Sequence, residues 1–183
     1  MPDSSITKKA LASSLRELMQ ERPFEKINVA MICDKCEMNR KSFYYHFRDK
    51  YDLVNWIFDS EFLPLAARAA QTDIRDSWGI IEEVCTFFYD NRSFYRKALQ
   101  ITGQNSLAEH MREYLAPLLT DRFCHLTGAD NADAFTVNFY TDAIFCTLMR
   151  WLQNKDCLPP QQFVGKLKNI LAMGGSIADR INK

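Results

Sequence analysis

The chain of 183 residues contains one short segment in which cationic, hydroxyl and aromatic side chains are interleaved, and it reads Arg40-Lys41-Ser42-Phe43-Tyr44-Tyr45-His46-Phe47. At helical spacing, Phe43 and Phe47 lie on one face and point towards a core. The other side chains then form an exposed face that contributes nothing to a core. Such a face suits the major groove of DNA, where Arg and Lys donate to guanine edges and aromatic rings contact thymine methyl groups or phosphates.

Two short helices are predicted to hold this face in place. Asn28 can cap the first of them, which has an apolar face made by Val29, Ile32, Cys33 and Cys36. That pattern breaks at residues 37–39, and Asn39 can cap the second helix, which begins at Arg40. Two helices joined by a tight turn, the second presenting a DNA-contacting face, describe a helix-turn-helix at about residues 28–47.

Further helices are predicted on both sides of this motif. One begins near Ser5 or Thr7 and ends at Pro23, because the residue before a proline avoids helical angles. Another begins after Asp49 and is expected to stop near Pro64. Because no alternation of polar and apolar residues is long enough for a strand, we predict an all-α fold. Its N-terminal helical domain covers residues 1–63, and a larger helical bundle covers residues 64–183.

Residues 5–63 resemble the DNA-binding domain of the TetR family of transcriptional regulators. The resemblance rests on Val29-Ala30-Met31-Ile32, on Tyr44-Tyr45-His46-Phe47 and on the following Lys50, at the spacing of the family. One departure lies in the turn, where the family usually has Ala-Gly and this chain has Cys36-Glu37. Glu37 must then adopt left-handed backbone angles at some cost, or the turn differs slightly.

The resemblance implies that a two-fold dimer binds a double-stranded, palindromic DNA operator, and it assigns a contact to each polar residue of the motif. Base reading is implied for Arg40, Lys41 and Ser42, phosphate and base contacts for Tyr44, Tyr45 and His46, and phosphate anchoring for Asn28 and Lys50. Two alternatives stay open at this point. Tyr44 can instead pack across the first helix, and His46 can instead only hydrogen-bond a neighbour.

The C-terminal bundle of the family serves dimerisation and effector binding. The helix expected over residues 133–153 is apolar on more than one face, which is typical of a helix buried on two sides. We therefore expect a homodimer, and the alternative is a central helix within a monomer. The candidates for an effector pocket are Phe87, Phe88, Tyr95 and His110. The alternative is that these side chains fill the core.

Two short segments are similar to a DhaS-like subgroup of the family, named after a dihydroxyacetone-kinase regulator. They are residues 52–58 and Asn91-Arg92-Ser93-Phe94-Tyr95. One member of that subgroup acts as an activator together with a protein co-regulator. The resemblance therefore leaves two points open, namely whether the chain represses or activates, and whether its effector is a small molecule or a protein.

Three other classes of protein were compared with this prediction. An enzyme is not favoured, because HExxH, GxSxG, GxxxxGK and GxGxxG are absent, so no catalytic residue, metal or cofactor is predicted. A redox sensor would use Cys33 and Cys36, but this pair has neither a second ligand pair nor a preceding strand, which favours small core residues. An interaction module without DNA binding is disfavoured by the basic residues Arg40, Lys41 and Lys50.

Composition limits the remaining classes. The chain has 23 basic and 23 acidic residues, which excludes a strongly basic coat for nucleic acid, although Lys35 to Lys50 forms a modest basic patch. Hydrophobic residues make up 47%, as in ordinary globular proteins. No uninterrupted apolar stretch is long enough to span a membrane, and the first residues do not form a signal peptide. We expect a cytoplasmic protein with no membrane partner.

Overall fold

The computed structural model describes residues 3–71, 77–102, 106–127 and 133–181, and every regular element within these ranges is a helix. The first part holds α1 (Asp3–Glu21), the 3-10 turn η1 (Phe24–Lys26), α2 (Val29–Lys35), α3 (Arg40–His46) and α4 (Lys50–Gln71). The second part holds α5 (Ser77–Asp90), α6 (Arg92–Ala98), α7 (Leu107–Thr127), α8 (Ala134–Gln153) and α9 (Pro160–Ile181). The predicted all-α fold is confirmed.

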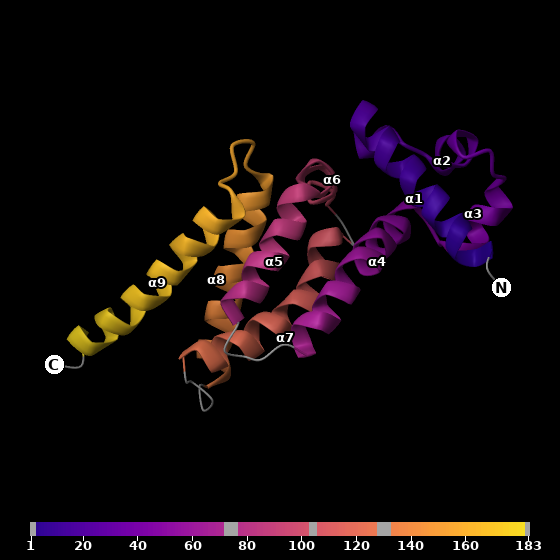
Figure 1. Ribbon diagram of the computed structural model, residues 1–183. Helices are drawn as coiled ribbons and strands as arrows, with labels where there is room; N and C mark the ends of the chain where they lie inside the picture. Colours follow the sequence, from indigo (N-terminus) through magenta and orange to yellow (C-terminus); the bar gives the residue numbers. More distant parts are fainter. Residues whose placement is uncertain (1–2, 72–76, 103–105, 128–132, 182–183) are drawn as a thin grey trace.

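Helix α4 connects the two parts of the molecule. In Figure 1, α1, α2 and α3 form a group at one end, α9 lies at the opposite end, and α4 runs from the first group into the bundle. There α4 packs against α7, α7 packs against α8, and α5 packs against α9. None of the described helices is long and apolar enough to cross a membrane.

The two predicted caps set the bounds of the short helices α2 and α3. The side-chain oxygen of Asn28 accepts a hydrogen bond from the backbone N–H of Met31 at 3.0 Å. Asn39 does the same for the N–H of Ser42 at 2.8 Å. A cap of this kind stabilises a helix by about 1 kcal/mol. Between them Glu37 has a φ of 54°, so the left-handed alternative for the turn is the correct one.

The expected end of the fourth helix near Pro64 is wrong, because α4 continues through Pro64 to Gln71. A proline inside a helix costs about 3 kcal/mol or more, since it removes one hydrogen bond and clashes with the preceding turn. The packing of Phe62 and Leu65, which are 0% and 7% exposed on either side of Pro64, offsets that cost. The division at residue 63 stays a prediction, and it falls in the middle of an unbroken helix. The first helix also begins earlier than expected, at Asp3.

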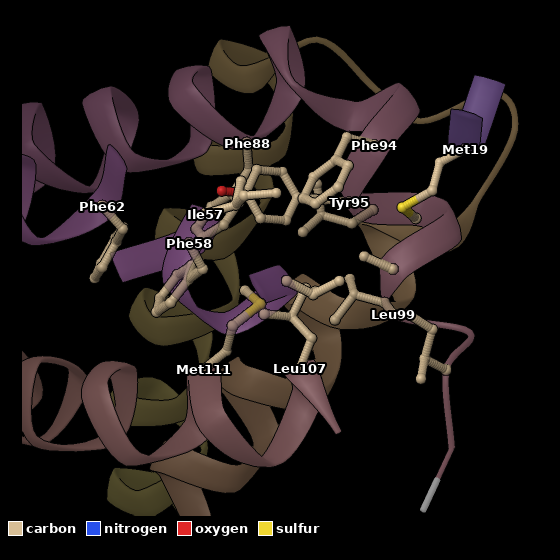
Figure 2. Close-up of a cluster of buried hydrophobic side chains, with 14 of the residues drawn as sticks. Met19, Ile57, Phe58, Phe62, Phe88, Phe94, Tyr95, Leu99, Leu107 and Met111 are labelled. Atoms are coloured by element: carbon tan, nitrogen blue, oxygen red, sulfur yellow. The ribbon is translucent and has the colours of Figure 1, made fainter. Parts of the chain in front are cut away.

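One hydrophobic core runs through both parts of the chain. In Figure 2, Phe58 and Phe62 of α4 meet Phe88 of α5 and Tyr95 of α6, with side chains of α7 below them. The rings of Phe58 and Phe62 stack at 4.9 Å, and the ring of Tyr95 meets Phe88 edge-on at 5.1 Å. Met19 of α1 reaches the same cluster. The helices around the predicted DNA-binding motif are therefore packed directly on the bundle.

Candidate nucleic-acid interface

Helix α3 has one buried and one exposed face, as its sequence predicts. Phe43 and Phe47 are 0% and 3% exposed and lie 5.7 Å apart beneath the helix. Tyr44 and Tyr45 are 58% and 81% exposed. Large aromatic side chains rarely stand this far into solvent without a partner, so the exposed face is a candidate binding surface.

The cationic residues lie on the same exposed side of the motif. Arg40 and Lys41 are exposed in the first turn of α3. Ser42 is half-buried, and its backbone N–H is taken by the cap of Asn39. Asn28 is exposed at the start of α2, where its cap uses only the side-chain oxygen and leaves the NH₂ group for an acceptor such as a phosphate. These side chains are suitable for the major groove and its flanking phosphates.

His46 lies apart from these cations, at the C-terminal end of α3. Its side chain is half-buried and its ring meets the ring of Tyr45 edge-on at 4.8 Å. It lines a cavity of about 380 Å³ together with residues of α1, α4 and α7, including Asp59 and His110. The phosphate or base contact implied for His46 stays a prediction.

Lys50 is held inside the fold rather than extended into solvent. Its ammonium donates to the backbone carbonyls of Phe24 and Ile27, at 2.8 and 2.7 Å, and lies 4.2 Å from the centre of the Phe24 ring. Burial lowers the pKa of Lys50. These bonds fix η1 and the approach to α2 against the start of α4. A phosphate contact of Lys50 stays a prediction, and it would use the one N–H of the ammonium that does not donate to these carbonyls.

Of the Cys33 and Cys36 pair, Cys33 belongs to the core and Cys36 is half-buried at the end of α2. Cys33 is 1% exposed, and burial raises the pKa of its thiol above the ordinary value. The thiol of Cys36, the residue that follows α2, lies 3.3 Å from the carbonyl oxygen of Ile32 in that helix. Because the Cys33 thiol resists ionisation and is buried, it is a poor nucleophile, and its environment does not favour redox sensing.

An ion pair joins α1 to α4, and sequence reasoning did not predict it. The guanidinium of Arg16 donates to both carboxylate oxygens of Glu61, at 2.7 and 2.6 Å, and the Tyr95 hydroxyl donates to the same carboxylate at 3.3 Å. The guanidinium also stacks 4.2 Å from the centre of the Phe94 ring. Arg16 and Glu61 are 45 residues apart, so no helical spacing links them. Burial raises the pKa of Tyr95, which stays a neutral donor.

A second link joins the last turn of α1 to α6. The ammonium of Lys97 donates to the carbonyl oxygens of Met19 and Gln20, at 2.6 and 3.2 Å. The last carbonyls of a helix lack partners within it and carry partial negative charge, so a cation there both bonds and stabilises the helix. Lys97 therefore ties the end of α1 to α6.

The four candidates for an effector pocket do not line one described cavity. Phe88 and Tyr95 are both 0% exposed and belong to the core, as the alternative reading held. Phe87 lines an open cavity between α4 and α5. His110 lines the other cavity, and its Nε2 lies 2.7 Å from a carboxylate oxygen of Asp59.

Helix α8 carries apolar side chains on two faces. Phe145, Leu148 and Leu152 are buried against the bundle. On another side Phe135 and Phe139, one helical turn apart, are 80% and 60% exposed. A helix that keeps two exposed phenylalanines beside a packed face has a second surface suitable for a protein partner.

Two models of known protein families match the sequence of this chain. The model of the tetR family of bacterial regulatory proteins matches residues 12–57, and a model described as a transcriptional regulator C-terminal region matches residues 76–172. The chain belongs to the tetR family. The two tetR matches cover the helix-turn-helix with its flanking helices and most of the bundle. The family is one of transcriptional regulators, and the predicted resemblance is confirmed.

Individual relatives of this tetR-family chain include DhaS proteins. The "HTH-type dhaKLM operon transcriptional activator DhaS" of Lactococcus lactis is 30% identical over 104 residues, which are 55% of this chain and 53% of that protein. The chain spans little more than half the length of the curated relatives it matches. The resemblance to DhaS stated from the sequence is thus supported.

Solved structures show the same tetR-type fold over nearly the whole chain. A "Dihydroxyacetone kinase operon activator DhaS" superimposes with a TM-score of 0.67 at 20% identity, over 94% of this chain and 97% of that one. A TetR transcriptional regulator from Streptococcus agalactiae gives a TM-score of 0.71 at 21% identity, over 94% and 95%. At this level of identity the likeness concerns the fold alone.

Proposed function

We propose that the chain is a DNA-binding transcriptional regulator that recognises a palindromic operator as a homodimer in the cytoplasm. The observation that carries this proposal is the exposed face of α3. Arg40 and Lys41 stand at its start, Tyr44 and Tyr45 along it, and Phe43 and Phe47 fix its orientation from below. Cations supply the bonds to guanine edges, and the aromatic rings supply apolar contacts and phosphate bonds.

The dimer is proposed to form through α8 and α9. Phe135 and Phe139 of α8 are exposed, and so is Ile170 of α9, at 62%. A two-fold interface over these helices would cover apolar surface that the single chain leaves in water. Two copies of α3 could then enter successive major grooves, which are about 34–36 Å apart in B-DNA.

The bundle is proposed to hold the effector-dependent switch. An effector can change DNA affinity only if it binds one arrangement of the two recognition helices better than the other. The contacts of Arg16 with Glu61 and of Lys97 with the end of α1 support such a coupling, because both join the motif to α4 and α6.

The test is to select bound fragments from random DNA and to footprint the selected sites. Symmetric protection of two half-sites is expected, with a dimer at micromolar concentration in sedimentation. Arg40→Ala should relax preference at one base position by about 1–3 kcal/mol, whereas the exposed Lys155→Ala far along the chain should change nothing. Asymmetric footprints, or equal losses for Arg40→Ala on selected and random DNA, would contradict the proposal.

A further inference from the structure

An open cavity of about 730 Å³ lies between α4 and α5 and is not used by the DNA-contacting face. Its apolar lining is supplied by Pro64, Leu65 and Phe87. Leu65 is buried, Phe87 is half-buried, and the Phe87 ring lies 6.2 Å from that of Phe62 beneath it. The cavity therefore has an aromatic and aliphatic floor built on the shared core.

The rim of this cavity is acidic. Four carboxylates line it, those of Glu61, Glu82, Glu83 and Asp90, against the single guanidinium of Arg68. Arg68 is paired with Glu83 across the opening between α4 and α5. Among the described residues, the carboxylates of Glu82 and Asp90 have no cationic partner. An apolar floor below uncompensated negative charge is complementary to a ligand that is both hydrophobic and cationic.

We propose that this cavity binds a small hydrophobic cation, such as an aromatic or alkyl ammonium compound, and that this cation is the effector of the regulator. The proposal rests on the proposed function for its regulatory part. The floor formed by Phe87 and Leu65 accepts the apolar body of the ligand. Glu82 and Asp90 compensate its charge at the rim, and the face of the Phe87 ring is attractive to a cation. A neutral or anionic compound of the same shape lacks this complementarity.

Glu61 gives the cavity a direct connection to the DNA-binding motif. Its carboxylate lines the cavity and at the same time holds the Arg16 guanidinium of α1 through two hydrogen bonds. A cation seated against Glu61 competes with Arg16 for the same two oxygens. The ligand therefore favours arrangements in which α1 is less tightly held to α4. Since α1 packs on α2 and α3, this change reaches the recognition helix.

The experiment uses two ions of matched shape and opposite charge, tetraphenylphosphonium and tetraphenylborate. Calorimetric titration of the full-length protein without DNA is expected to show binding of the cation and none of the anion, with affinity that falls as salt is added. The double variant Glu82→Gln/Asp90→Asn should weaken cation binding at least tenfold. The matched control Glu109→Gln/Glu113→Gln removes two carboxylates from the other cavity and should leave binding unchanged.

Three results of this titration would overturn the cation site: no binding of tetraphenylphosphonium, equal binding of both ions, or unchanged binding in Glu82→Gln/Asp90→Asn. The regulatory part is measured separately, as the affinity for a selected DNA site with and without the cation. A shift of at least threefold is expected in the natural sequence, and none in Arg16→Met, where the competition is removed. An unchanged DNA affinity in the natural sequence overturns the effector role.

The calorimetric titration and the DNA-affinity measurement also separate this inference from the proposed function. If the protein selects no DNA site even without the cation, the proposed function is wrong. Calorimetry with the two ions decides the cation site independently of that result, because it contains no DNA.

Discussion

Removing the Arg16 guanidinium should loosen α1 from the bundle by a measurable amount. Arg16→Met keeps most of the side-chain stem and deletes the two hydrogen bonds to Glu61 as well as the stacking on Phe94. Hydrogen bonds to charged groups contribute about 1.5–3 kcal/mol when well shielded. The two side chains are 24% and 34% exposed, so solvent screening moves the pair towards the 0.2–1 kcal/mol typical of surface pairs. We expect a coupling energy of about 1 kcal/mol between Arg16 and Glu61.

The coupling is measured with a double-mutant cycle of Arg16→Met, Glu61→Gln and their combination. The readout is the free energy of unfolding from urea titrations followed by circular dichroism. Arg16→Met alone should cost more than the coupling energy, because the stacking on Phe94 is lost in addition. Because one core runs from α1 to α7, the unfolding should remain a single transition in every variant.

The outcome that refutes this reasoning is additivity. If the two single losses sum to the double loss within about 0.3–0.5 kcal/mol, the ion pair does not couple α1 to α4 in solution. A biphasic transition in the natural sequence would equally refute the shared core as the link between the two parts.

Three further predictions concern separate features. Glu37→Gly should raise the free energy of unfolding by about 0.5–1 kcal/mol in urea titrations, because glycine adopts the φ of 54° without the penalty of a side chain; a loss of stability would contradict this explanation of the turn. Phe139→Glu should convert the dimer to a monomer in sedimentation while the circular dichroism spectrum is retained, since this exposed ring contributes little to the single chain; a persistent dimer would exclude this face of α8. Burial raises the pKa of the Cys85 thiol to about 12, so the native state keeps a proton that the unfolded chain loses from about pH 9. Stability should therefore fall above pH 9 by up to roughly 1.4 kcal/mol per pH unit for this group, and Cys85→Ala should make that slope shallower; an unchanged slope would show that Cys85 does not contribute.

The buried and exposed faces of α3 were predictable because they depend on local spacing. Asn28 and Asn39 are capping residues placed directly before apolar periodic segments, and both make the expected bonds. Phe43 and Phe47 are separated by one helical turn, which fixes the buried side of α3 wherever the helix packs. The cost of Glu37 in the turn could be foreseen for the same reason, since the backbone angles of a tight turn are a local property.

The contacts that join the two parts of the molecule were not predictable. Pro64 predicted the end of a helix. Only the burial of its neighbours Phe62 and Leu65 shows why α4 continues. Lys50 is the first residue of α4, but its side chain donates to the carbonyls of Ile27 and Phe24, which lie 23 and 26 residues earlier in the sequence. Lys97 reaches 78 residues back to Met19. Such contacts depend on how helices are packed, and a single sequence does not contain that information.

The unbroken course of α4 limits how the DNA-binding part can be exchanged between proteins. A chimaera cut at residue 63 would divide a helix in mid-course and separate Phe58 and Phe62 from the Phe88 ring that stacks on them. Residues 1–63 moved to another protein would also lose the Lys97 contact that holds the end of α1, and the Tyr95 hydroxyl that donates to Glu61. If α3 contacts DNA as proposed, substitutions on its exposed surface, such as at Lys41 or Tyr45, are a more direct way to new operator preferences than exchange of residues 1–63 as a unit. Residues 1–63 are therefore better altered by point substitutions than exchanged as a unit.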